Sequence, residues 1–120
     1  MRERLRALVG VLAELGYSAT FTSGYRSSRK QAQLYREHLA GRSKYPVAPP
    51  GRSTHEYGLG VDVVSDAPDD MLRYAANYSG LVWFGPKDRV HFDPYGPAAW
   101  REILARGGVS TAAEASPPDS

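Results

Sequence analysis

The sequence predicts an α+β domain in which helices pack against a small, mainly antiparallel sheet. Apolar side chains recur at helical spacing over residues 2–15, whereas later short runs rich in Val and aromatic residues are bounded by glycine and proline. A length of 120 residues suits one domain with a modest core. We assign that domain to residues 1–107 and expect residues 108–120, which have little apolar surface to bury, to be disordered.

The first half of the chain predicts two helices, one strand and a long loop. Residues 2–15 form an amphipathic helix, and residues 17–21, rich in Thr and aromatics, form a short strand. Ser28 caps a second helix that runs to about residue 40. Residues 42–52 contain three prolines and a glycine, which predicts an irregular loop.

The second half predicts three strands and two further helices. Residues 60–64 read as a buried strand, and residues 68–77 form a helix that begins at a proline. Residues 81–84 and 90–92 form two short strands, which the tight turn G-P-K-D joins. Residues 97–106 form the last helix.

Composition and charge exclude several classes of protein. There is no cysteine, so neither disulfides nor thiolate metal ligands are available. The formal charge of +2 is too small to indicate nucleic acid, and we attribute the nine Lys or Arg in residues 1–44 to a solvated helix face. No stretch is long enough to cross a membrane, and the first helix lacks the cleavage pattern of a signal peptide. We expect a monomer.

The stretch S-T-H-E-Y-G-L-G-V-D contains an imidazole and a carboxylate seven positions apart, His55 and Asp62. Gly58 and Gly60 lie between them and allow a sharp turn into the following strand, because glycine adopts positive φ without steric cost. Asp62 stands within a run of valines, where an unpaired carboxylate would be costly to bury. We therefore expect it to have a partner, either a metal ion or an arginine.

The stretch D-R-V-H-F supplies a second imidazole, His91, and a second carboxylate, Asp88. An isolated His or Asp is usually a solvated or hydrogen-bonded structural residue, so the combination carries the signal. Two His and one Asp, with the fourth position left to water, form the pattern of a catalytic zinc site, with Asp88 as the base beside that water. Strand residues three apart face opposite sides, so we expect Asp88 in the turn and His91 on the strand.

Five further residues are candidates for binding substrate or supporting the site. Arg26, in the motif S-G-Y-R-S, is either a surface charge or a guanidinium that binds a carboxylate or a developing oxyanion. Gln31 either braces Arg26 or faces solvent. Ser53 begins the histidine motif, and Tyr57 and Trp83 either wall a substrate groove or belong to the core.

Together these three motifs, spanning about residues 23–93, resemble the signatures of the LAS metallopeptidases, which share the hedgehog/DD-peptidase-like fold. The likeness is to the branch that holds VanY-type D-alanyl-D-alanine carboxypeptidases and phage L-alanyl-D-glutamate endopeptidases. It implies one Zn²⁺ in a single cleft, with metal ligands His55, Asp62 and His91. It also implies Asp88 as general base and Arg26 as the arginine that binds substrate and stabilises charge near the scissile carbonyl.

The resemblance implies zinc-dependent hydrolysis of peptide bonds in peptidoglycan stem peptides, in cell-wall lysis or remodelling. The short length, the missing export signal and the Asp base favour the endopeptidase, whereas the Pro-Gly loop and the S-G-Y-R-S motif favour the carboxypeptidase. A catalytically silent peptidoglycan-binding or virion-associated module of the same fold is the alternative, which the intact ligand set and base disfavour. We expect access to the cell wall by phage release at lysis, within a virion, or through an export segment outside this sequence.

Overall fold

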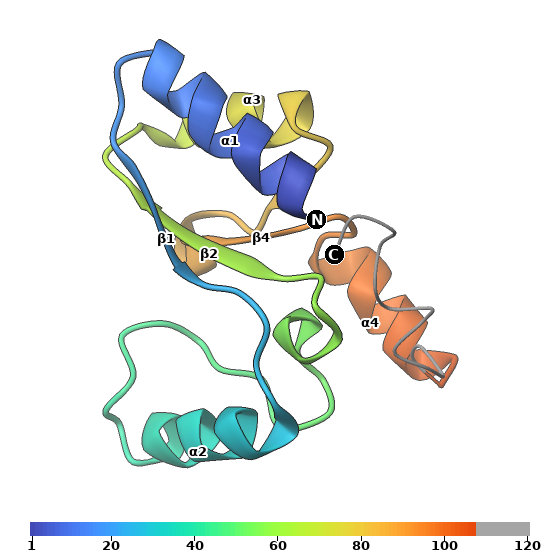
Figure 1. Cartoon of the computed structure of the whole chain (residues 1–120). Helices are drawn as coiled ribbons and strands as arrows, with labels where there is room; N and C mark the ends of the chain where they lie inside the picture. Colours follow the sequence, from blue (N-terminus) through green and yellow to red (C-terminus); the bar gives the residue numbers. More distant parts are fainter. Residues whose placement is uncertain (108–120) are drawn as a thin grey trace.

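The computed structural model describes residues 1–107 and confirms an α+β fold (Figure 1). The expectation of a disordered tail falls on residues 108–120, outside the described part. The helices and strands are α1 (Arg2–Glu14), β1 (Ala19–Ser23), α2 (Ser28–Leu39), β2 (Val61–Ser65), α3 (Asp69–Tyr78), β3 (Val82–Trp83), β4 (His91–Asp93) and α4 (Pro97–Ala105). Two short 3₁₀ helices, η1 (Thr54–Tyr57) and η2 (Pro86–Asp88), complete the list. Within residues 1–107, no helix combines the length and apolar character needed to span a bilayer.

The four strands form one antiparallel sheet in the order β1-β2-β4-β3. Because β4 pairs with both β2 and β3, the second histidine motif enters the sheet beside the strand that carries the first motif's carboxylate. Asp62 and His91 are direct partners in the β2–β4 register. Segments far apart in the sequence therefore meet at the centre of the sheet.

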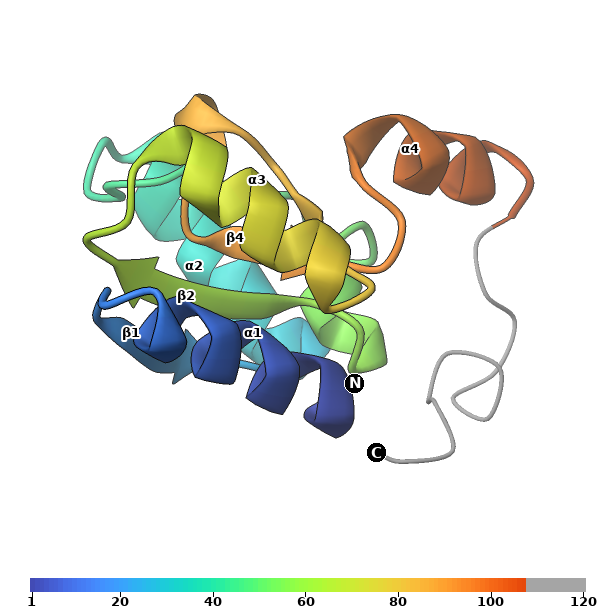
Figure 2. The same cartoon turned by 90° about the horizontal axis from the view of Figure 1, so that it is seen from above.

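One face of the sheet is covered by α1 and α3, which lie side by side in Figure 2. Leu8 and Leu12 of α1 and Leu72 of α3 are almost fully buried against Val63 and Phe92 of the central strands. Because strand side chains alternate between faces, burying Val63 and Phe92 here turns Asp62 and His91 to the opposite face. The core thus positions the candidate site.

The opposite face is bordered by α2, the 42–52 loop and η1 (Figure 1). Helix α2 is capped by Ser27 and not by Ser28, because the Ser27 hydroxyl accepts a hydrogen bond from the Lys30 N–H at 3.1 Å. The Ser28 hydroxyl instead donates to Glu56 at 2.9 Å, which ties the start of α2 to η1.

The first strand begins two residues later than its sequence pattern indicates. The Tyr17 N–H donates to the Leu12 carbonyl at 2.9 Å and so completes the end of α1. Pairing with β2 starts at Ala19, opposite Ser65. The aromatic and Thr residues of this run therefore serve two elements, and propensity alone did not separate the helix end from the strand.

Candidate metal centre

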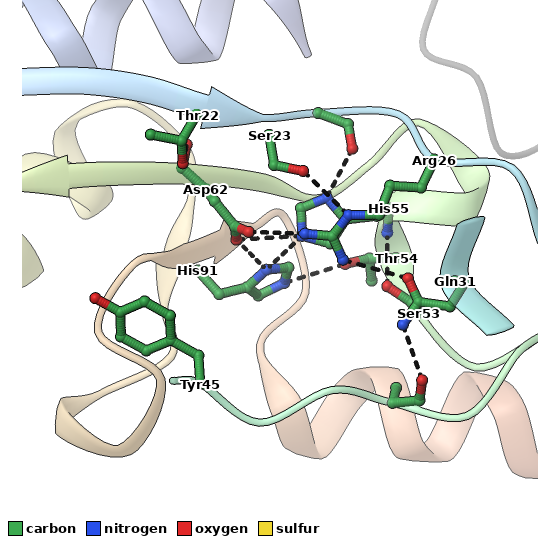
Figure 3. Close-up of polar contacts among 12 residues, drawn as sticks. Thr22, Ser23, Arg26, Gln31, Tyr45, Ser53, Thr54, His55, Asp62 and His91 are labelled. Carbon is green, nitrogen blue, oxygen red and sulfur yellow. Dashed lines mark hydrogen bonds and ion pairs between the residues drawn. The ribbon is translucent and has the colours of Figure 1, made fainter. Parts of the chain in front are cut away.

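Three side chains from the two histidine motifs converge on one point beside the central strands β2 and β4 (Figure 3). His55 Nε2 lies 3.1 Å from His91 Nδ1, and each of these nitrogens lies 3.2 Å from Asp62 Oδ1. His55 and His91 are buried, and Asp62 is half-buried. The structure thus brings together the three residues that the sequence pattern proposed as metal ligands.

Local backbone geometry positions His55. Ser53 caps η1 by accepting a hydrogen bond from the His55 N–H at 3.2 Å, and Glu56 closes the cap by accepting from the Ser53 N–H at 3.2 Å. Gly58 ends η1 with a φ of 73°, a left-handed conformation that favours glycine. The sharp turn expected between His55 and Asp62 is therefore a capped 3₁₀ helix followed by a left-handed glycine.

Gly60 allows the two motifs to approach each other closely. A Cβ atom at this position would lie 2.5 Å from the Thr54 hydroxyl oxygen and 2.8 Å from Cε1 of His91. Real Cβ atoms do not make contacts this short. The second glycine of the motif is therefore required by packing against the His91 ring.

Hydrogen bonds to the far side of each ring fix which nitrogen faces the centre. His55 Nδ1 lies 2.7 Å from the Gly24 carbonyl, which can only accept, so Nδ1 carries the proton. His91 Nε2 lies 3.1 Å from Asp93 Oδ2 and 3.1 Å from the Thr54 hydroxyl. Facing a carboxylate, Nε2 is also the protonated nitrogen. In the neutral imidazoles, the lone pairs of His55 Nε2 and His91 Nδ1 therefore point at each other and at Asp62 Oδ1.

Three converging electron pairs require a cation, and their spacing suits a metal ion. Zinc binds His nitrogen and carboxylate oxygen at about 2.0–2.1 Å in a tetrahedral arrangement, which separates adjacent ligand atoms by about 3.3 Å. The separations here are 3.1, 3.2 and 3.2 Å. Carbonyl and carboxylate acceptors on the outer ring nitrogens are also the usual surroundings of metal-binding histidines. The residues present therefore fit a single metal ion.

Without a metal, a proton serves as that cation. Burial alone would lower the pKa of His91, but its hydrogen bonds to Asp62 and Asp93 outweigh burial and raise the pKa to about 9. Burial acts in the opposite direction on Asp62, where it would raise the pKa, yet the interactions of the carboxylate with His55 and His91 hold this pKa well below its usual range. The centre thus keeps a negative carboxylate beside a protonated imidazole.

Arg26 is part of this network, and the structure also shows which of the two alternatives raised for Gln31 holds. Its guanidinium donates to Asp62 Oδ2 at 2.9 Å, to the Ser23 hydroxyl at 3.0 Å and to Gln31 Oε1 at 3.2 Å. Gln31 is 1% exposed and donates through Nε2 to the Ala48 carbonyl at 2.8 Å. Gln31 therefore braces Arg26 and anchors the 42–52 loop, and Asp62 has an arginine partner in addition to the two imidazoles.

Asp88 lies in η2, within the turn, and His91 begins β4, as the strand geometry required. Asp88 is half-buried and lines the same cavity as the three converging residues. Burial is the main reason why its pKa is raised above the usual carboxyl value, and the nearby Asp62 raises it further. Within residues 1–107 its carboxylate accepts no hydrogen bond from another residue, so it can accept a proton.

The cavity has a volume of about 280 Å³, and residues of the 42–52 loop form part of its wall. Ser53 lines it, but Tyr57 and Trp83 are not among the residues that do. The Tyr57 hydroxyl donates to the Gly51 carbonyl at 3.1 Å, and its ring meets Trp100 edge-on. Trp83 is buried in the core, where its Nε1 donates to the Arg89 carbonyl at 2.8 Å. The core alternative raised for Trp83 is the one observed.

Sequence reasoning missed two residues that hold His91, namely Asp93 and Thr54. Asp93 is fully buried, and its second oxygen accepts hydrogen bonds from the N–H groups of Tyr95 and Gly96 at 2.8 Å each. The sequence signal that could have found Asp93 was the alternation of side chains along a strand. In the strand H-F-D, Asp93 is two residues after His91 and therefore lies on the same face.

Comparisons with known proteins identify the family to which this chain belongs. Residues 1–83 match the family model VanY, D-alanyl-D-alanine carboxypeptidase. The chain is 30% identical over 84 residues to the peptidoglycan L-alanyl-D-glutamate endopeptidase CwlK of Bacillus subtilis. That match covers 67% of this chain and 48% of the relative, so the chain spans about half the length of the curated relative.

Solved structures share the fold. The L,D-carboxypeptidase DacB from Streptococcus pneumonia superposes with a TM-score of 0.60 at 25% identity, over 87% of this chain and 68% of DacB. A second match is a mutant of the vancomycin resistance D,D-pentapeptidase VanY, from a VanB-type cassette and in complex with Zn(II). It superposes with a TM-score of 0.56 at 22% identity, over 93% of this chain and 79% of the VanY chain. On the family match, which takes in His55 and Asp62, the chain belongs to the VanY (D-alanyl-D-alanine carboxypeptidase) family of LAS-type peptidases.

Proposed function

We propose that this chain is a zinc-dependent peptidase that hydrolyses peptide bonds in the stem peptides of peptidoglycan. The observation that carries the proposal is the convergence of His55, Asp62 and His91 in the cavity that Asp88 also lines. The VanY family model and the similarity to CwlK support peptidoglycan as the substrate class. The cell wall is accordingly the proposed place of action.

His55, Asp62 and His91 are the residues that would hold the ion. Two imidazoles and one carboxylate also accept other divalent metals, and zinc is preferred because this set is typical of catalytic zinc sites. Bound zinc would polarise the scissile carbonyl and lower the pKa of water in the position that three protein ligands leave open. The complex of the related fold with Zn(II) supports the same choice of metal.

Asp88 acts as general base and then as general acid. It lines the cavity, and its pKa is raised by burial, which brings the carboxylate closer to the pKa suited to proton transfer near neutral pH. In its ionised form it takes a proton from the attacking water. It then returns that proton to the amine that leaves when the peptide bond breaks.

Arg26 holds Asp62 and stabilises negative charge on the substrate. A guanidinium has five N–H groups, and the contacts to Asp62, Ser23 and Gln31 use three of them. The remaining two can donate to a carbonyl oxygen as charge develops on it. The amide oxygen of Gln31 accepts from Arg26 and its nitrogen donates to the loop, so we assign Gln31 to positioning these two parts. Ser53 accepts from the His55 N–H, so we assign it to positioning His55.

Two bonds are candidates within this function. The family model favours removal of the terminal D-alanine, and the similarity to CwlK favours cleavage between L-alanine and D-glutamate. The direct test is mass spectrometry of the products after zinc-loaded protein is incubated with stem peptides of defined sequence. Loss of one terminal alanine identifies the carboxypeptidase, whereas a cut between L-alanine and D-glutamate identifies the endopeptidase.

Two variants test the roles of individual residues in the same assay. Asp88→Ala should retain zinc and lose most turnover, and wild-type rates in this variant would rule out Asp88 as the base. His55→Ala should lose both zinc and activity, and a normal zinc content would remove His55 from the ligand set. If wild-type protein binds zinc and stem peptides but releases no product, a peptidoglycan-binding module replaces the enzyme as the best account.

A further inference from the structure

Three cationic side chains belong to residues that line the cavity, Arg26, Lys44 and Arg52, and they differ in how far the protein already occupies them. Arg26 is tied to three neighbours by its guanidinium (Figure 3). Lys44 places its ammonium over the Tyr45 ring, 5.5 Å from the centroid. The Arg52 guanidinium forms no hydrogen bond or ion pair with any other residue in the range 1–107. Arg52 is therefore the uncommitted cation of this cavity.

The backbone of Arg52 is fixed even though its side chain is free. Its N–H donates to the Pro49 carbonyl at 3.1 Å, and its carbonyl accepts from Trp100 Nε1 at 2.8 Å. On either side, the N–H groups of Gly51 and Ser53 donate to the carboxylate of Glu56 at 2.9 and 3.2 Å. The backbone of Arg52 is thus held at a set place, three positions before His55, so the start of its side chain has a fixed position beside the cavity.

The charged residues that line the cavity balance when the histidines are neutral, with Arg26, Lys44 and Arg52 against three carboxylates. Two of these carboxylates already have partners, because Asp62 binds Arg26 and the buried Asp93 accepts from His91 and backbone N–H groups. A bound divalent ion would make the total charge positive. A ligand with a negative charge next to the reacting bond would be complementary to the cavity.

We propose that Arg52 binds the free α-carboxylate of the substrate residue that follows the scissile bond. This inference rests on the proposed function and makes it more specific. In D-alanyl-D-alanine the residue after the bond is the terminal D-alanine, whose carboxylate is free. In a stem peptide, D-glutamate continues through its γ-carboxyl, so its α-carboxylate is free as well. One arginine at this place therefore serves either bond, because both substrates present a carboxylate on a D-residue.

The test compares peptides that differ only in this carboxylate. The first pair is L-Lys-D-Ala-D-Ala with a terminal acid or a terminal carboxamide, and the second is L-Ala-D-Glu, amidated at the γ-carboxyl, with an α-acid or an α-amide. Dissociation constants are measured by calorimetry on zinc-loaded protein in an Asp88→Ala background, which prevents turnover. With Arg52 present, the acid of at least one pair should bind about tenfold or more tightly than its amide, as expected for a charge-assisted hydrogen bond. We call this ratio of affinities the acid-to-amide ratio. In Arg52→Gln the acid-to-amide ratio should fall to about one.

Matched variants separate this site from general electrostatics. Arg29→Gln removes the same charge from an exposed position of α2 that does not line the cavity, and it should leave the acid-to-amide ratio unchanged. Arg52→Lys keeps the charge and should retain part of the ratio, because an ammonium lacks the planar fork of a guanidinium. Loss of the ratio in Lys44→Gln but not in Arg52→Gln would overturn the assignment.

The outcomes also separate this inference from the proposed function. If the active protein cleaves stem peptides but Arg52→Gln preserves the acid-to-amide ratio, the carboxylate site is wrong and the peptidase stands. If nothing is cleaved while binding still discriminates acid from amide through Arg52, the site stands and the peptidase is wrong. If none of these acids binds better than its amide to protein with Arg52 intact, the inference is overturned.

Discussion

Replacing Asp93 by Asn should weaken zinc binding without removing a metal ligand. Asp93 is fully buried, with one oxygen on the N–H groups of Tyr95 and Gly96 and the other 3.1 Å from His91 Nε2. In Asn the oxygen stays with the two backbone donors, because the amide nitrogen cannot accept. The NH₂ group then faces His91 Nε2–H, and two donors oppose each other.

The structure sets the size of this effect. Moving the His91 proton from Nε2 to Nδ1 would satisfy the new amide, but Nδ1 is the atom that faces Asp62 and the metal position. Thr54 offers a second acceptor for Nε2–H at 3.1 Å, so the metal-binding tautomer stays accessible at the cost of one unpaired amide. Loss of partners outside the ligand set weakens metal binding by about 10- to 100-fold. We expect about tenfold for Asp93→Asn, or about 1.4 kcal/mol, and about 100-fold when Thr54→Val is added.

Competition with a chromogenic chelator measures the zinc dissociation constant. Asp66→Asn is the matched control, because it removes the same charge from an exposed residue that lies beyond the end of β2. A second readout is the pKa of His91 in the metal-free protein, which should drop from about 9 because Asp93 no longer supports the imidazolium. Unchanged zinc affinity together with an unchanged His91 pKa, in a variant that folds, would refute the account of how His91 is held.

Three other perturbations test the same centre. Zinc must displace the proton that His91 holds in the metal-free protein, so the apparent affinity should rise about tenfold per pH unit up to about pH 9, with one proton released, as calorimetry in buffers of different ionisation enthalpy can show. Gly60→Ala should reduce zinc content in elemental analysis, because its Cβ would press against Thr54 and the His91 ring. In the pH profile of kcat/KM, the acidic limb assigned to Asp88 should lie above 3.8, since burial raises this pKa and activity requires the ionised form.

Much of the centre was predictable because short-range pattern and strand alternation determine it. The glycines after His55 and the valines around Asp62 indicated a turn followed by a buried strand, and β2 begins at Val61. The three-residue interval between Asp88 and His91 placed one residue in a turn and the other on a strand, and η2 and β4 have this arrangement. These inferences used no information about which strands pair.

The remainder depends on pairing and packing across the chain, which local pattern does not contain. Arg26 reaches Asp62 only because β1 and β2 are neighbours, with Ser23 opposite Asp62 after a break in register. Trp83 belongs to the core because β3 lies at the edge of the sheet beneath α3, where Arg73 stacks over its ring at 5.1 Å. An aromatic residue in a short strand fits a groove or a core equally well until its neighbours are known.

The ligand set and the cavity wall are held by different parts of the fold. The separation of Asp62 and His91 is fixed by the register of β2 and β4, a property of the backbone. The wall formed by residues 42–52 is an irregular loop that Gln31 secures at Ala48 and Glu56 secures at Gly51. The backbone pairing of Asp62 and His91 takes no part in either tie, so substitutions at loop positions other than Ala48 and Gly51 should alter the shape and charge of the cavity while β2 and β4 keep their register. We therefore assign the choice between the two candidate bonds to this loop and the chemistry common to both to the sheet.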